Sequence, residues 1–280
     1  MASYLEARSR GGEWLVRIED LDPPREKPGA AIDILETLDR LGLHWDGPVL
    51  RQSTRTEAYQ AALDQLARGG HLRECSCSRA ALAALPENQQ RVAGDELYHP
   101  RQCLVPVSDH PGERALRLRV PDRVVEFVDR VQGPQAINVA RTVGDFVLRR
   151  RDGLHAYQLA VVVDDADQGV TDVVRGADLL SSTPRQVLLR ETLGLPAVTY
   201  MHVPLAVDAG GLKLSKSEDA PRLAGAGPAA QAVAALEFLR QEPPPGLAQG
   251  KVSDVWEWAV SNWHPERFAG EAARRVPEPA

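Results

Sequence analysis

Apolar residues recur at helical spacing in the first third of the chain, and short apolar runs alternate with these segments. The clearest helix is Ala30–Leu41, where apolar residues recur every third position from Ile32 and the pattern stops at Gly42. Further helices are predicted over Met1–Arg10, Thr54–Ala67, Pro184–Leu193, Ala229–Leu239 and Ser253–Trp263. Strands are predicted over Trp14–Ile18, Val49–Gln52, Phe146–Arg149, Tyr157–Val163 and Met201–Val207. This alternation predicts an α/β fold whose parallel sheet is covered by helices.

The alternation breaks between about Cys75 and about Gly133. This stretch holds all three cysteines, several prolines and two β-rich runs, Ala115–Val120 and Val124–Val131. We interpret it as an inserted subdomain. The predicted organisation is therefore 1–74 and 134–220 as two parts of one domain, 75–133 as the insertion, and 221–280 as a helical C-terminal region.

Composition narrows the class of protein without identifying it. An apolar content of 43% and a charged content of 26% over 280 residues are ordinary for a globular protein. A net charge of −6 argues against general nucleic-acid binding but leaves room for a local basic face. No apolar run reaches the roughly 20 residues that cross a bilayer, and no signal-peptide pattern opens the chain. We therefore expect a cytoplasmic protein without a membrane partner.

The cysteines form a candidate metal site. Cys75 and Cys77 offer two thiolates from one turn, and Cys103 offers a third. An odd, tightly grouped set fits a metal better than a disulfide framework. Tyr98 and His99 are the candidates for the fourth ligand, and imidazole is the commoner ligand on chemical grounds. The alternative is three unconnected buried thiols.

A polar loop follows the predicted strand Met201–Val207. It reads Lys213-Leu214-Ser215-Lys216-Ser217, the lysine loop, and is introduced by two glycines. Two lysines three residues apart form a cationic clamp suited to the negative charge that develops on a triphosphate as pyrophosphate leaves. Taken alone, such a loop is more often an ordinary solvated surface segment.

Three further segments stand in a fixed order before this loop. They are Arg17–Arg25, which reads RIEDLDPPR, then Asp145–Leu148, then Tyr157–Asp165. In this order they resemble the catalytic domain of the class I glutamyl-tRNA synthetases, with the lysine loop as the Lys-Met-Ser-Lys-Ser signature carrying Leu for Met. The resemblance implies a Rossmann-like catalytic domain with a small zinc-binding insertion.

The resemblance also implies roles for single residues. Glu19 would bind the amino group of L-glutamate, Arg175 its side-chain carboxylate, and Tyr157 would add a hydroxyl to the same ligand. Arginine suits a carboxylate because its guanidinium binds in a bidentate manner. The alternatives are a solvated acid at Glu19, a core tyrosine at Tyr157, and an Arg175 paired on the surface with a neighbouring aspartate.

The remaining implied roles concern ATP and the metals. Lys213 and Lys216 would act on the phosphates of ATP, and magnesium would arrive with ATP. The resemblance places a tyrosine shortly before the last zinc-binding cysteine, which favours Tyr98 over His99. Asp164, Asp165 and Asp167 also suggest a magnesium cluster, but the family pattern assigns that stretch to a turn beneath the adenosine.

The number of residues that follow the lysine loop indicates which subfamily the chain resembles. Only 63 residues follow Ser217, and Pro243–Pro245 divides them, which is too little for a helical anticodon-binding region. The chain therefore resembles the glutamyl-queuosine tRNA(Asp) synthetase family. Its members activate glutamate with ATP and esterify it to queuosine in the anticodon of tRNA(Asp). The alternatives are another acceptor such as tRNA(Glu), or a non-catalytic tRNA-binding zinc protein. We expect a monomer.

The beginning of the chain leads to a first prediction. Family members carry a strand and a His-Ile-Gly-His-type phosphate-binding loop before the first helix, and here the chain starts inside that helix. We expect about two dozen residues to be missing. The chain should therefore show little glutamate-dependent ATP–pyrophosphate exchange, and a form extended by in-frame upstream codons should exchange readily. Equally robust exchange by both forms would contradict this expectation.

The lysine loop leads to a second prediction. Lys216→Ala should lower the rate of glutamate activation by about 10²–10³-fold, because a lysine on the leaving phosphates acts mainly in the transition state. Steady-state kinetics of the exchange reaction separate this from ground-state binding. An unchanged rate with a raised KM for glutamate would show that the role is wrongly assigned.

Overall fold

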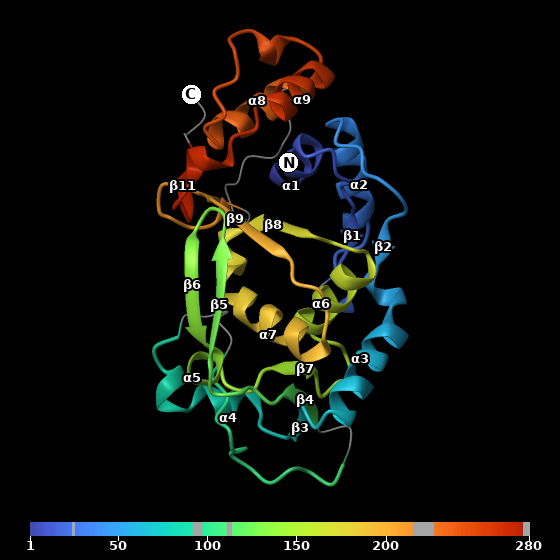
Figure 1. The fold of residues 1–280 in the computed structure, drawn as a ribbon, viewed down its shortest axis with the longest axis vertical. Coiled ribbons are helices and arrows are strands. Elements are labelled where there is room, and N and C mark those ends of the chain that lie inside the picture. The colour runs from blue at the N-terminus through green and yellow to red at the C-terminus, as the bar shows by residue number, and fades with distance from the viewer. Residues whose placement is uncertain (24–25, 92–96, 111–113, 215–226, 277–280) are drawn as a thin grey trace.

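The computed structural model describes residues 1–23, 26–91, 97–110, 114–214 and 227–276 (Figure 1). It confirms the α/β class. The larger of its sheets has four strands in the order β6-β5-β9-β8. These strands are β5 (Val124–Asp129), β6 (Gly133–Asn138), β8 (Asp172–Gly176) and β9 (Thr199–Val203). Strands β5, β9 and β8 are parallel, and β6 forms an antiparallel hairpin with β5.

The first part of the chain follows the predicted alternation. It contains α1 (Ala2–Ser9), β1 (Arg17–Ile18), α2 (Ala30–Arg40), β2 (Leu50–Arg51) and α3 (Thr56–Arg68). Strands β1 and β2 pair in parallel, as a helical crossover between them requires. Both strands are shorter than predicted. Their carboxyl ends carry Glu19 and Gln52 toward the middle of the molecule.

One predicted strand is wrong. Tyr157–Val163 belongs to a helix, α6 (Tyr157–Asp167), whose residues from Gln158 to Asp164 are all buried. The β-branched run suggested a strand, but a helix buried on every side also reads as a continuous apolar run, and periodicity alone does not separate the two. Helix α6 lies beside α7 (Thr183–Leu193) and α3, and these helices share the main core with the apolar residues of the neighbouring strands.

A second, three-stranded sheet closes the lower end of the molecule in Figure 1. It contains β3 (Leu72–Cys75), β4 (Ala115–Leu118) and β7 (Val147–Arg149), all antiparallel. Two short helices lie near it, α4 (Arg79–Ala83) and α5 (Val139–Thr142). The two β-rich runs of the predicted insertion thus join different sheets: β4 pairs with β3 and β7, whereas β5 joins the four-stranded sheet. The division into domains stays a prediction.

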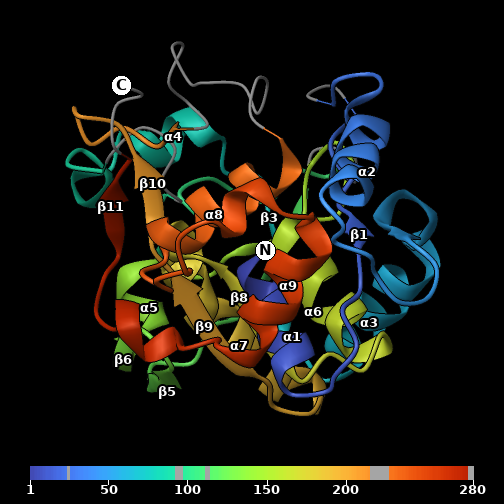
Figure 2. The same ribbon diagram turned by 90° about the horizontal axis from the view of Figure 1, so that it is seen from above.

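The C-terminal region packs on the first helix. Helices α8 (Pro228–Phe238) and α9 (Val252–Ser261) lie over α1 (Figure 2). Trp256 and Trp263 are buried there, and their indole nitrogens donate to the Leu41 carbonyl at 2.6 Å and to the Glu6 carboxylate at 2.8 Å. These two tryptophans are therefore part of a helix core and are not available for stacking on bases.

The predicted strand Met201–Val207 is divided at Pro204. Its second half, β10 (Leu205–Val207), pairs in parallel with β11 (Ala273–Arg275), so the last described strand lies beside the start of the lysine loop. The 3-10 segments in the described residues include η2 (Gln52–Thr54), η3 (Pro86–Asn88), η7 (Leu247–Gln249) and η8 (Pro265–Phe268). Another, η5 (Ala177–Ser182), leads directly from β8 into α7. Within the described ranges, no helix combines the length and apolar character that a bilayer crossing requires.

Candidate active site and metal centre

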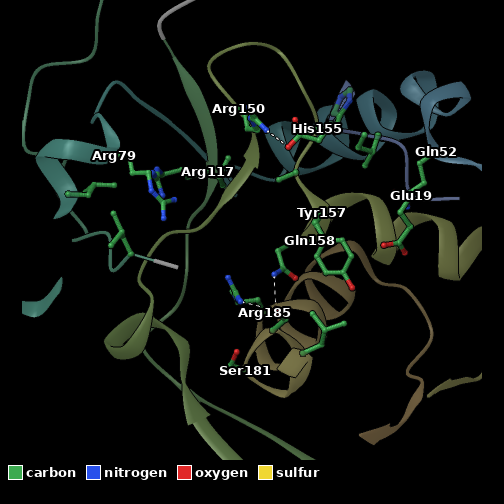
Figure 3. Close-up of a pocket in the computed structure, with 18 of the residues that line it drawn as sticks. Glu19, Gln52, Arg79, Arg117, Arg150, His155, Tyr157, Gln158, Ser181 and Arg185 are labelled. Carbon is green, nitrogen blue, oxygen red and sulfur yellow. Dashed lines mark hydrogen bonds and ion pairs between the residues drawn. The ribbon is translucent and has the colours of Figure 1, made fainter. Parts of the chain in front are cut away.

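A cavity of about 850 Å³ opens between the N-terminal end of α6 and the segment that carries the cysteines. Glu19, Tyr157 and Asp178 line one part of it, and Cys77 and Arg117 line the other. Figure 3 shows Glu19 and Tyr157 on one side of the opening and Arg79 and Arg117 on the other. The cavity thus carries both acidic and basic groups, and two of them, Asp22 and Arg150, pair with each other at 3.3 Å.

Glu19 is held by a neighbouring arginine. One terminal nitrogen of Arg17 lies 3.3 Å from a Glu19 oxygen, and the other lies 2.9 Å from Asp165 of α6. Partial burial raises the pKa of Glu19, and Arg17 offsets part of this rise. The carboxylate is thus fixed at the end of β1, at the rim of the cavity, where it can accept a cationic ligand group.

Tyr157 begins α6 and points into the cavity (Figure 3). Burial raises its pKa, the charge of Glu19 adds to this, and the guanidinium of Arg175 opposes it. The phenol therefore stays a neutral hydrogen-bond donor at ordinary pH. The charge of Arg175 also opposes the rise in the pKa of Glu19. Glu19, Tyr157 and Arg175, which the resemblance groups together, therefore lie within electrostatic reach of one another.

Arg175 lies in β8 beneath this region. Its Nε donates to His202 Nε2 at 3.0 Å, and one terminal nitrogen donates to Thr183 Oγ1 at 2.8 Å. The alternative of a surface ion pair is not found among the described residues: Asp178 pairs with Lys213 instead, and Asp172 bonds to Thr199.

The described end of the lysine loop reaches the cavity rim. Lys213 Nζ lies 2.5 Å from Asp178 Oδ2, and Asp178 lines the cavity. Lys216 lies outside the described residues, so its role stays a prediction.

The aspartates near the end of α6 bind protein groups. Asp164 accepts hydrogen bonds from Gln52 at 2.8 Å, Arg55 at 3.1 Å and Tyr59 at 2.7 Å. Asp165 pairs with Arg17, and Asp167 with Arg55. These contacts occupy the carboxylates in joining α6 to the first part of the chain, which agrees with the structural interpretation of the stretch rather than with a magnesium cluster.

The three cysteines meet at one point together with a histidine. The ligand atoms of Cys75, Cys77, His99 and Cys103 all lie within 4.8 Å of one another, and Cys75 Sγ is 3.1 Å from His99 Nε2. Of the two candidates for a fourth ligand, His99 belongs to this cluster. The backbone of Tyr98 is bound on both sides by the side-chain amide of Asn88.

The donor set fits a zinc ion. Three sulfurs and one imidazole nitrogen form one of the common tetrahedral ligand sets of structural zinc. Burial raises the pKa of the Cys75 thiol, but the hydrogen bond with His99 and the charge of Arg117 outweigh burial and lower it to about 6. Burial and the neighbouring Cys75 raise the pKa of Cys103 to about 12. Binding of a dication would release the proton of the Cys103 thiol, because cysteine binds a metal ion as the thiolate.

A glycine fixes the backbone of His99. The His99 amide donates to the Val143 carbonyl at 2.8 Å, and Gly144 follows with φ of +75°. A Cβ at Gly144 would stand 1.8 Å from the His99 carbonyl oxygen, so no side chain fits there. The backbone directly after α5 is therefore packed closely against His99 of the cluster.

The family described as class I tRNA synthetases for glutamate and glutamine, catalytic domain, matches residues 1–223. The chain belongs to this family. Proteins named glutamyl-Q tRNA(Asp) synthetase from Dechloromonas aromatica and Pseudomonas aeruginosa are each 52% identical to it. They match over 94% and 96% of the chain and over 87% and 88% of their own lengths. These matches confirm the resemblance to the glutamyl-queuosine tRNA(Asp) synthetases that the sequence motifs indicated.

Solved structures agree on the fold. A glutamate-tRNA synthetase from Elizabethkingia anophelis superposes with a TM-score of 0.78 over 99% of the chain at 23% identity. The chain spans 64% of that protein's length. This supports the class I synthetase catalytic fold.

Some residues around the site were missed in the sequence. His202 and Asp129 carried no recognisable pattern, because a lone histidine in a strand and an aspartate at a turn have many uses. For the fourth metal ligand the sequence offered both Tyr98 and His99, and the cluster contains His99.

The metal cluster leads to a prediction about composition. Purified protein should carry about one zinc per chain, and Cys75→Ser or Cys103→Ser should release it. His99→Ala should also lose the metal, whereas the neighbouring Tyr98→Phe should keep it. Elemental analysis of each variant gives the answer, and a zinc-free unsubstituted protein would contradict the metal site.

Gly144 provides an independent test. Gly144→Ala should weaken zinc binding about 10-fold or more, because the methyl group displaces His99 without touching any sulfur. Competition with a chromophoric chelator measures the affinity. Gly153→Ala is the matched control, since Gly153 also has a positive φ (+86°) but open space around its Cβ position. Equal affinities in the two variants would contradict this role of Gly144.

Proposed function

We propose that this protein activates L-glutamate with ATP and transfers it to the queuosine base in the anticodon of tRNA(Asp). The observation that carries the proposal is the 52% identity, over nearly the whole chain, to proteins named for that reaction. Glu19 and Tyr157 line one cavity, and the charge of Arg175 reaches both of them, which supports glutamate as the amino acid.

In the first step the α-carboxylate of glutamate attacks the α-phosphorus of ATP, and pyrophosphate leaves. Glu19 accepts the ammonium group, and Tyr157 donates its hydroxyl to the ligand. Arg175 neutralises the side-chain carboxylate. Lys213 and Lys216 stabilise the charge that develops on the leaving phosphates. Magnesium enters with ATP, whose phosphates it binds.

In the second step a hydroxyl of the queuosine cyclopentenediol attacks the carbonyl of the adenylate, and AMP leaves. The cavity of about 850 Å³ is where we place the modified base, and Arg79, Arg117 and Arg150 line it. These cations offer contacts to the phosphates of an anticodon loop. An acidic protein that binds phosphates on one face only should do so in a salt-sensitive manner.

Zinc has a structural role in this proposal. Cys75, Cys77, Cys103 and His99 would hold the ion, which would join the end of β3 to the segment 97–110 before β4. Cys77 also lines the cavity, so the metal supports the wall that faces the tRNA. We place the protein in the cytoplasm, where ATP and tRNA are found, and expect a monomer.

The acceptor is tested with radiolabelled glutamate. We expect transfer to tRNA(Asp) from queuosine-proficient cells and at least about 100-fold less transfer to tRNA(Asp) from queuosine-deficient cells, because only queuosine brings a diol of this kind into the loop. The assay uses the chain and its upstream-extended form, with tRNA(Glu) alongside.

Two outcomes would overturn the subtype. Equal charging of both tRNA(Asp) preparations would show that the modified base is not the acceptor. Preference for tRNA(Glu) would favour an ordinary glutamyl-tRNA synthetase activity instead.

A further inference from the structure

A buried chain of polar groups runs from the β5–β6 hairpin to Arg175. His202 is fully buried in β9, and Asp129 at the end of β5 is 1% exposed. Asp129 Oδ2 lies 2.6 Å from His202 Nδ1, and His202 Nε2 lies 3.0 Å from Arg175 Nε. The imidazole therefore stands between a carboxylate and a guanidinium, with one ring nitrogen on each.

The geometry fixes the protons on the imidazole. Arg175 Nε always carries a hydrogen, so His202 Nε2 must accept there and must be unprotonated. Nδ1 then carries the proton and donates it to Asp129. Thr183 Oγ1, 3.1 Å from Nε2, lies in the same group and accepts from a terminal nitrogen of Arg175 at 2.8 Å.

The acceptors around Arg175 are neutral. They are the imidazole of His202, the hydroxyl of Thr183 and the Leu179 carbonyl at 3.5 Å. Among the residues that the structure describes, no carboxylate lies within 4.0 Å of its nitrogens. These neutral acceptors fix the orientation of the Arg175 guanidinium without neutralising its positive charge. The charge is therefore available to an anionic group of a ligand.

Asp129 is itself firmly placed. It accepts hydrogen bonds from the backbone amides of Val131, Gln132 and His202 at 2.8–3.2 Å. The side chain of Gln132 in turn donates to the His202 carbonyl at 2.9 Å. The imidazole is therefore locked at both ring nitrogens and along its backbone.

We propose that His202, oriented by Asp129, is a positioning residue that sets the direction of Arg175 and so tunes the affinity for the side-chain carboxylate of glutamate. This role rests on the proposed function. His202 contacts no substrate in it. It acts through Arg175, and Thr183 supports the same guanidinium from the first turn of α7.

Two substitutions at His202 distinguish the effect of losing the hydrogen-bond acceptor for Arg175 from the effect of changing the size of the side chain. His202→Leu removes both ring nitrogens and should raise the KM for glutamate about 10–100-fold, the range expected when a charged hydrogen bond is lost. The rate constant at saturation and the KM for ATP should change much less. His202→Gln places an amide oxygen near the Nε2 position and should restore the KM to within a few-fold. His44→Leu, at a side chain that is 71% exposed, is the matched control.

The readout is glutamate-dependent ATP–pyrophosphate exchange in the more active of the two forms compared above. A KM for glutamate that is unchanged in His202→Leu, with an active parent protein, would overturn the positioning role alone. Absence of glutamate-dependent exchange in the parent would overturn the proposed function, and the positioning role with it.

A second variant covers the case in which His202→Leu does not fold. Thr183→Val keeps the shape of a buried side chain but removes its contact with Arg175, and it should raise the KM for glutamate in the same direction. An unchanged KM in folded Thr183→Val would then overturn the proposal. Nitrogen-15 NMR of the parent should find His202 neutral, with its proton on Nδ1. A proton on Nε2 would also overturn it, because Arg175 could not then donate there.

Discussion

The buried carboxylate of Asp164 joins the two parts of the fold. It accepts from Gln52, Arg55 and Tyr59, which lie more than a hundred positions earlier in the chain. A buried ionised carboxylate is tolerated only when donors satisfy it, so these three side chains cannot be removed singly without a large cost in stability. Through this contact α6 is held against α3 and the end of β2, and the position of Tyr157 at the other end of α6 follows from it.

The same helix also determines where Glu19 lies. Arg17 contacts both Glu19 and Asp165. The position of the Glu19 carboxylate therefore depends on α6 as well as on its own short strand. Arg175 is fixed from the other side by β9 and α7. Glu19 and Arg175 thus come from separate elements, and each is held by side chains of another element, which pre-organises these two groups before any ligand enters.

The helices and the α/β class could be predicted from the sequence because their signals are local. Ala30–Leu41 has regular apolar spacing and a glycine stop, and it forms α2 almost as expected. Tyr157–Val163 could not be assigned correctly, because burial on every side removes the periodicity that separates a helix from a strand. The cysteines could be grouped by spacing alone. The choice of His99, and the buried pair Asp129 and His202, depend on contacts between distant segments that no local pattern records.

The pairing of β10 with β11 has a practical consequence for handling the protein. The amide of Val276 donates to the Val207 carbonyl at 2.9 Å, and Val207 forms a bridge with Lys213. A purification tag or reporter fused directly after Arg275 would therefore be expected to disturb β10, the strand that precedes the lysine loop. A flexible spacer should separate any fusion partner from this edge, and a fluorophore placed there would report on movement of Lys213.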